Sequence, residues 1–174
     1  HIIPKGLDHI LFIFGLFLFS SSIGKLVKQI TIFTIAHSIT LILVSLLFIK
    51  INPQLVEPII ALSIVYIGLE NIFKIYTKEY IRYVVILFFG LLHGLGFALV
   101  LSDIGYKSSK LFLNLISFNI GIEVAQILII LTLYLLVAIK FSRNKYYRNV
   151  FQIPSSIFIA SIGLYWFVER IGIL

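Results

Sequence analysis

Residues 29–49 read QITIFTIAHSITLILVSLLFI, a run of 21 residues that contains no Asp, Glu, Lys, Arg, Gly or Pro. At about 1.5 Å of rise per residue, a helix of this length spans roughly 30 Å, which is the thickness of the hydrocarbon core of a bilayer. The apolar residues form a continuous run instead of alternating every second position, so the segment predicts a transmembrane helix and not a barrel strand. His37 lies near its middle.

The same character recurs along the whole chain. Of its 174 residues, 60% are hydrophobic and 12% are charged, whereas soluble domains are about half apolar and a quarter charged. We therefore expect an all-α polytopic protein of the lipid bilayer, folded as a single transmembrane domain over residues 1–174. Six predicted transmembrane helices in one bundle cover residues 7–23, 29–49, 56–76, 81–101, 111–139 and 153–173.

The basic residues indicate the topology. The net charge of +7 does not point to a nucleic-acid partner, because Lys and Arg fall in short segments between the spans. Nine of them follow the first, third and fifth spans, and five lie on the other side. The positive-inside rule then places both termini outside the cytoplasm. Because the chain starts at His1 and has no Met, we expect an upstream signal peptide or N-terminal region to be missing from it.

Three of the four histidines, His9, His37 and His93, lie in stretches of Leu, Ile, Phe and Val. Ionisable side chains in hydrocarbon cost a few kcal/mol, so they survive mainly where they face one another, a cavity or a ligand. Small residues surround His93, which predicts that it points into the bundle. Asp8 precedes His9, and Glu123 lies near the centre of the fifth span, where a carboxylate is most costly.

These residues predict an intramembrane site for a divalent metal ion. The chain has no cysteine, so imidazole, carboxylate or carbonyl groups would hold the metal, and imidazole suits nickel, cobalt, zinc and copper alike. The predicted ligands are Asp8, His9, His37, His93 and Glu123. The predicted supporting polar residues are Ser38, Asn119, Gln126, Glu70, Asn71 and Glu57.

Several candidates also have a purely structural interpretation. Asp8 and His9 would pair with each other at the end of a span. His37 would be a packing histidine bonded to a backbone carbonyl or to Thr34. Glu70 lies near the end of its span, where it would snorkel or pair with a neighbouring lysine.

The order and content of the polar motifs resemble the HupE/UreJ family of bacterial membrane proteins. The motifs that carry the resemblance are Asp8-His9, FTIAHSITL at 33–41, VEP at 56–58, ALSIV at 61–65, FGLLHGLGFA at 89–98 and FNIGIEVAQ at 118–126. The resemblance runs over nearly the whole chain. It implies a protein of the bacterial inner membrane that imports nickel, and sometimes cobalt, for hydrogenase and urease.

The chain departs from the nickel-permease motifs of that family at identifiable positions. Six residues separate His1 from Asp8, where the nickel permeases have five. Phe89 and Gly96 stand where their fourth-span motif has a histidine and a glutamate. The similarity is therefore to a second branch of the family, and the residues that carry over from the nickel motifs are Asp8, His9 and His93.

The leading prediction is a permease for a divalent first-row metal cation, nickel or cobalt, that works through the intramembrane histidines and carboxylates. No ATP-binding loop of the GxxxxGK[ST] type is present, so transport would be passive, driven by the membrane potential or coupled to protons. The alternative is an intramembrane zinc-dependent hydrolase with Asp8 or Glu123 as general base. A third interpretation is an accessory subunit whose polar residues only lock helices together. The oligomeric state stays open, with a homo-oligomer among the expected forms.

Overall fold

The computed structural model describes residues 6–20, 22–46, 49–74, 78–103, 111–138 and 146–172, and the regular structure within them is helical. Two short π-helical segments accompany the α-helices: η1 (Tyr134–Ala138) continues α5, and η2 (Arg148–Gln152) leads into α7. The α-helices are α1 (Leu7–Phe19), α2 (Ile23–Leu46), α3 (Pro53–Phe73), α4 (Glu79–Asp103), α5 (Leu111–Leu133) and α7 (Ile153–Arg170).

Five stretches of helix are long and apolar enough to cross a membrane by length and composition: Ile23–Leu46, Pro53–Phe73, Glu79–Leu99, Leu113–Val137 and Arg148–Arg170. They agree with five of the six predicted spans. The sixth, α1, has 13 residues and reaches only about 20 Å, short of the roughly 30 Å of a bilayer core. The backbone leaves the helix at Ser20, which is extended at φ −74° and ψ 127°.

The predicted start of the second span was wrong by six residues, because α2 already begins at Ile23. Lys25 and Lys28 are therefore part of the helix instead of a loop. Both find partners on α4: the Lys25 ammonium lies 3.6 Å from the Glu79 carboxylate, and the Lys28 ammonium lies 4.4 Å from the centre of the Tyr83 ring. Charges at a helix end remain compatible with a membrane span when they are paired in this way.

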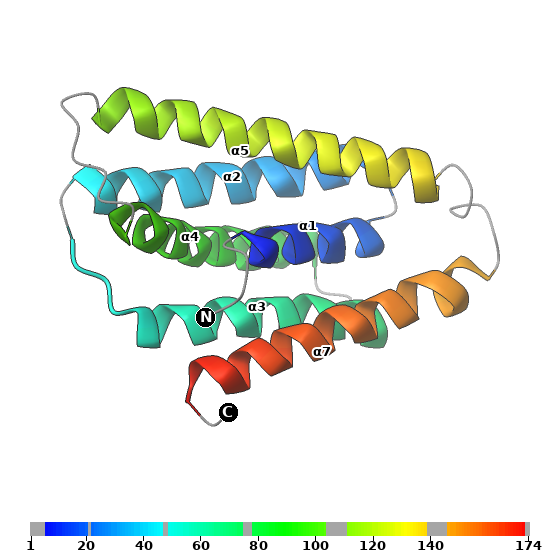
Figure 1. Cartoon of the computed structure of the whole chain (residues 1–174). Helices are drawn as coiled ribbons and strands as arrows, with labels where there is room; N and C mark the ends of the chain where they lie inside the picture. The colour runs from blue at the N-terminus through cyan, green and yellow to red at the C-terminus, as the bar shows by residue number, and fades with distance from the viewer. Residues whose placement is uncertain are drawn as a thin grey trace.

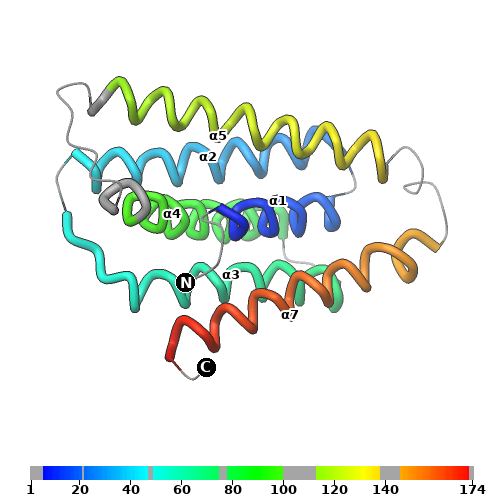
Figure 2. Tube along the Cα trace, viewed as in Figure 1, coloured from blue at the N-terminus to red at the C-terminus, as the bar shows by residue number. Residues whose placement is uncertain are grey.

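Helix α1 lies at the centre of the bundle and contacts α2, α3, α5 and α7. Although short, it has seven buried residues. Figure 1 shows α2 and α5 along one side, α3 and α7 along the other, and α1 and α4 between them. The start of α1 and the end of α7 lie at the same end of the bundle (Figures 1 and 2). The assignment of that end to the outside of the cell stays a prediction.

Helices α2 and α4 approach closely because α4 has glycine at the contact. A Cβ atom on Gly90 would lie 2.7 Å from the Phe33 carbonyl oxygen. One on Gly94 would lie 2.9 Å from Cα of His37 and would also overlap the Thr40 hydroxyl. Thr40 bridges the same two helices by donating to the Leu91 carbonyl at 2.9 Å. The Gly90–Gly94 pair is therefore a packing motif that brings the backbone of α4 against His37.

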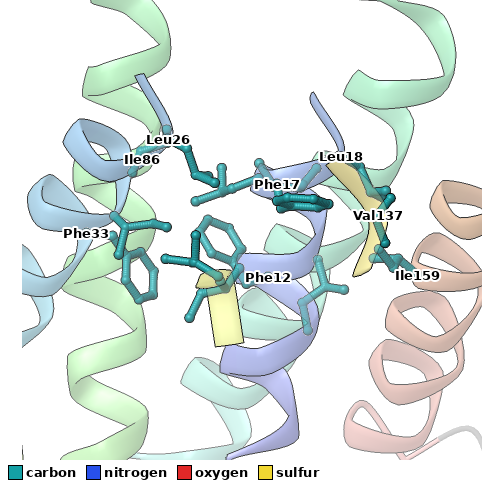
Figure 3. Packing of buried hydrophobic residues seen from close by; sticks show 14 of the residues in the cluster. Phe12, Phe17, Leu18, Leu26, Phe33, Ile86, Val137 and Ile159 are labelled. Atoms are coloured by element: carbon teal, nitrogen blue, oxygen red, sulfur yellow. The ribbon is translucent and has the colours of Figure 1, made fainter. Parts of the chain in front are cut away.

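The apolar core is continuous along α1. In Figure 3, Phe12 of α1 lies near the centre, with Phe33 of α2 and Ile86 of α4 on one side and Val137 and Ile159 on the other. The rings of Phe12 and Phe33 stack at 4.9 Å between centroids, and both side chains are fully buried. This layer lies directly beside the buried histidines.

Candidate metal-cation site

Three histidines from three helices meet inside the bundle. His9 of α1, His37 of α2 and His93 of α4 are 8%, 0% and 1% exposed. The ring centroids of His9 and His93 are 4.7 Å apart, and those of His9 and His37 are 5.5 Å apart. The prediction that His93 points into the bundle is confirmed. We call these three residues the histidine cluster.

A hydrogen-bond chain fixes which nitrogens of the cluster are available. The Ser63 hydroxyl on α3 lies 2.6 Å from the Ile60 carbonyl and 2.9 Å from Nε2 of His93. A hydroxyl has one proton and a carbonyl can only accept, so Ser63 donates to Ile60 and accepts from Nε2–H of His93. Nδ1 of a neutral His93 then accepts from Nδ1–H of His9, 3.2 Å away. This leaves the lone pair of His9 on Nε2.

The cluster therefore presents unpaired nitrogens in the buried interior of the bundle. Within the described residues, Nε2 of His9 and both ring nitrogens of His37 are buried without a partner in hydrogen-bond geometry, although the Phe33 backbone and the Asn119 side chain lie near the His37 ring. A buried polar atom without a partner costs about 1–3 kcal/mol, which a ligand would recover. In the part of the chain that the structure describes, no three His, Asp or Glu side chains are already arranged to hold one metal ion together. Both nitrogens of His93 are engaged, one by Ser63 and one by His9.

Aromatic side chains enclose the cluster. Phe97 lies 4.3 Å from His9 between ring centroids, and Phe12 and Phe33 each lie 5.1 Å from His93. The first two contacts come from α4 and α1 and the third from α2. Such walls exclude water and lower the local dielectric, which strengthens every polar contact within them.

Asp8 lies beside the cluster in sequence but is bound elsewhere. Its Oδ2 accepts from Nη2 of Arg170 at 2.8 Å, and the two side chains are 17% and 10% exposed. The structural interpretation in which Asp8 pairs with His9 was wrong, since the partner is an arginine on α7. The carboxylate is thus held at the end of α7, next to the first histidine of the cluster.

Glu123 does not join the histidine cluster, contrary to the prediction. Its side chain is exposed on α5 and faces an open groove of about 460 Å³ lined by Thr34, Ile35, Ser38, Ile39, Ile42 and Leu43 of α2. Glu123 lies on the same face of α5 as Asn119 and Gln126, and this face does turn toward α2. The sequence does not reveal that α5 packs on the side of α2 that faces away from the histidine cluster.

Asn119 and Gln126, two of the predicted supporting residues, attach α5 to α2. Ser38 donates to Oδ1 of Asn119 at 2.7 Å, and Thr34 donates to Oε1 of Gln126 at 2.7 Å. His37 lies between Thr34 and Ser38 in sequence but makes neither bond. Asn119 and Gln126 therefore attach α5 to α2, and the Asn119 side chain also lies near the ring of His37.

The remaining supporting residues lie away from the cluster. Glu70 is buried and pairs with Arg82 of α4 at 2.6 Å, so the predicted snorkelling or lysine partner was wrong. Asn71 donates to the Gly15 carbonyl of α1 at 3.0 Å. Glu57 contributes its backbone carbonyl, which accepts from Arg170 at 3.0 Å.

Comparison with known proteins gives the family. The sequence model of the family described as HupE / UreJ protein matches residues 1–170, essentially the whole chain. The chain belongs to the HupE/UreJ family. No curated protein and no solved structure was found that matches it. Family membership and the apolar helices together indicate an integral membrane protein.

Two residues of this HupE/UreJ protein that bear on the site were missed by sequence reasoning. Ser63 is 0% exposed and holds His93. The sequence did contain a signal for Ser63, because it is a polar residue within an apolar run of α3 and lies inside the motif ALSIV at 61–65. Arg170 pairs with Asp8, and nothing in its local sequence reveals that α1 and α7 bring the two residues together.

Proposed function

We propose that this HupE/UreJ protein is a permease that moves a divalent first-row metal cation, nickel or cobalt, across the inner membrane of a bacterium. The observation that carries the proposal is the convergence of three buried histidines from α1, α2 and α4 in an apolar interior. Buried ionisable residues inside a membrane bundle are costly, and they mark ion pathways more often than structural contacts.

The ligand chemistry supports a transported cation. Imidazole nitrogen binds nickel, cobalt and zinc, and the chain has no cysteine thiolate that would hold such a cation more permanently. An entering cation would first meet the unpaired Nε2 of His9 and a ring nitrogen of His37. Replacing the His9–His93 hydrogen bond with metal coordination would bring in the third ring. A site completed only in the presence of its cargo suits binding followed by release.

A zinc-dependent hydrolase has no such support. Its candidate general bases were Asp8 and Glu123, but Asp8 is bound by Arg170 and Glu123 faces the groove on the far side of α2. Neither of these two carboxylates therefore stands free beside the histidine cluster to activate a water molecule. The interpretation as an accessory subunit makes a different prediction, namely that cluster variants would change only stability.

The proposal is tested by metal uptake into proteoliposomes. We expect the wild-type protein to import at least one of Ni²⁺, Co²⁺ and Zn²⁺. Because each variant removes a ligand, His37→Ala and His93→Ala should lower the initial rate at least about tenfold, equivalent to about 1.4 kcal/mol. Thr132→Ala is the matched control, since Thr132 is exposed on α5 and bonds only within its helix. Absence of flux in folded wild-type protein, or equal flux in the histidine variants, would contradict the proposal.

A further inference from the structure

The Asp8–Arg170 ion pair closes the bundle at the end where α1 starts and α7 ends. The carboxylate oxygen and the guanidinium nitrogen are 2.8 Å apart, and both side chains are largely buried. A charge-assisted bond of this length is among the strong interactions of a protein. It joins the first turn of α1, which carries His9, to the last residue of α7.

Arg170 has contacts that do not depend on Asp8. Its Nη1 donates to the Glu57 carbonyl on α3 at 3.0 Å, and its guanidinium carbon lies 5.5 Å from the centre of the Trp166 ring. The charge of Arg170 is also close enough to act electrostatically on the His93 ring. The guanidinium is thus held beside the cluster by α3 and α7, and it would keep these contacts if Asp8 turned away.

A dication bound to the cluster would need a negative counter-charge. Three neutral imidazoles supply lone pairs but no charge, and moving an uncompensated ion into a low-dielectric interior costs several kcal/mol. Of the predicted acidic ligands and supporting residues, Glu123 faces the outer groove and Glu70 is paired with Arg82. Asp8 is the residue next to His9 in the first turn of α1, and in this structure its carboxylate is already paired with the guanidinium of Arg170.

We propose that Arg170 is a tethered counter-cation: it neutralises Asp8 while the site is empty, and the transported metal cation displaces it. This inference rests on the proposed function and adds a specific role for a residue outside the ligand set. The guanidinium and the cargo compete for one carboxylate. The competition lowers the affinity for the cargo and lets Arg170 replace the metal at Asp8 during release.

The competition predicts that replacing Arg170, although it lies beside the binding site, strengthens binding of the metal cation. Equilibrium binding of Ni²⁺ to the purified full chain in detergent measures it, with Co²⁺ and Zn²⁺ as further probes. Because the competitor is removed, Arg170→Gln should lower the Kd about tenfold, whereas Asp8→Asn should raise it by at least as much. The double variant Asp8→Asn/Arg170→Gln should bind like Asp8→Asn alone, since without the carboxylate there is nothing to compete for.

Arg148→Gln is the matched control. Arg148 also donates to a backbone carbonyl of α3, that of Ile72 at 3.1 Å, and in the described part of the chain it has no carboxylate partner. Its replacement should leave the Kd unchanged. A purely structural role of Arg170 gives a different pattern, in which Arg170→Gln lowers the melting temperature and weakens binding.

The outcomes separate this inference from the proposed function. If wild-type protein binds Ni²⁺, Co²⁺ or Zn²⁺ and His37→Ala abolishes the binding, but Arg170→Gln binds equally or more weakly, the counter-cation role is overturned and the permease is not. If folded wild-type protein binds none of the three, both fall. Should Arg170→Gln fail to fold, Arg170→Met decides, because it removes the charge and keeps most of the apolar stem of the side chain. A folded Arg170→Met variant that binds no tighter than wild type overturns the proposal.

Discussion

At the scale of single residues, one hydroxyl proton determines which nitrogens of the histidine cluster face a ligand. The Ser63 hydroxyl donates its hydrogen bond to the Ile60 carbonyl, so it can only accept from His93, which requires Nε2 of His93 to carry a proton. The bond from His9 to Nδ1 of His93 follows, and it leaves Nε2 of His9 free. Ser63 is thus a positioning residue that never touches the cation.

Ser63→Ala should therefore weaken metal binding from a distance. It leaves the buried Nε2–H of His93 without an acceptor, at about 1–3 kcal/mol, and favours the other tautomer, in which the His9 lone pair turns from Nε2 to Nδ1. Loss of a group that orients a ligand typically weakens metal affinity 10–100-fold, and we expect that range for the Kd of Ni²⁺.

Ser156→Ala is the control for this prediction. Ser156 is also 0% exposed and donates to a carbonyl of its own helix, that of Gln152 at 2.7 Å, but it contacts no histidine. It should cost about 0.5–1.5 kcal/mol of stability, the net value of a hydrogen bond, and should leave the Kd unchanged. Equal effects of the two serine variants on binding would contradict a positioning role for Ser63.

The residues also show what the sequence can predict. Burial of His37 and His93 followed from apolar surroundings, because a histidine in such a run must face inward. The partners of Asp8 and Glu70 did not follow, since Arg170 and Arg82 reach them from other helices. Pairing across a bundle depends on helix rotation and on which helices are neighbours, and neither is encoded locally.

At the scale of helices, the limits of a span are easier to predict than the face it buries. Runs of apolar residues located five long helices to within a few residues, except where Lys25 and Lys28 extended the start of α2. The continuous apolarity that identifies a transmembrane helix also removes the periodicity that would mark its inner face. Glu123 was misplaced because the sequence does not show on which side of α2 the polar face of α5 packs.

An ion pair inside the bundle connects α3 and α4. Glu70 and Arg82 have side chains 2% and 7% exposed, and the guanidinium carbon of Arg82 lies 3.8 Å from the centre of the Phe19 ring on α1. Arg82 therefore links three helices at the end of the bundle opposite to Arg170.

Arg82→Met should destabilise the protein by about 3–5 kcal/mol, because it leaves the Glu70 carboxylate buried and unpaired. The double variant Glu70→Leu/Arg82→Met should regain most of that loss, since it removes both charges. Unfolding in detergent followed by circular dichroism measures both. Glu79→Gln is the control: it breaks the exposed pair with Lys25 and should change stability little. A double variant as unstable as Arg82→Met would contradict the assignment.

At the scale of the whole molecule, the predicted orientation of the bundle depends on the basic residues that are not paired with carboxylates inside it. Arg82 and Arg170 are paired with carboxylates inside the bundle, so they contribute little to the charge bias. Leaving these two out of nine and five, the sequence has eight basic residues after the first, third and fifth predicted spans against four on the other side. The ratio on which the predicted cytoplasmic location of the first set rests therefore rises from nine to five to two to one.

The chain has no native cysteine, so single cysteines can test this orientation. Gln54, in the first turn of α3, and Tyr80 and Tyr146, at the opposite end of the bundle, are exposed and uncharged, and their replacement leaves the charge bias intact. In intact cells a membrane-impermeant maleimide should label Gln54→Cys. It should label Tyr80→Cys and Tyr146→Cys only after lysis, because the end with eight basic residues stays in the cytoplasm. The reverse pattern would place the Asp8–Arg170 end of the bundle inside the cell and reverse the side from which the histidine cluster is first reached.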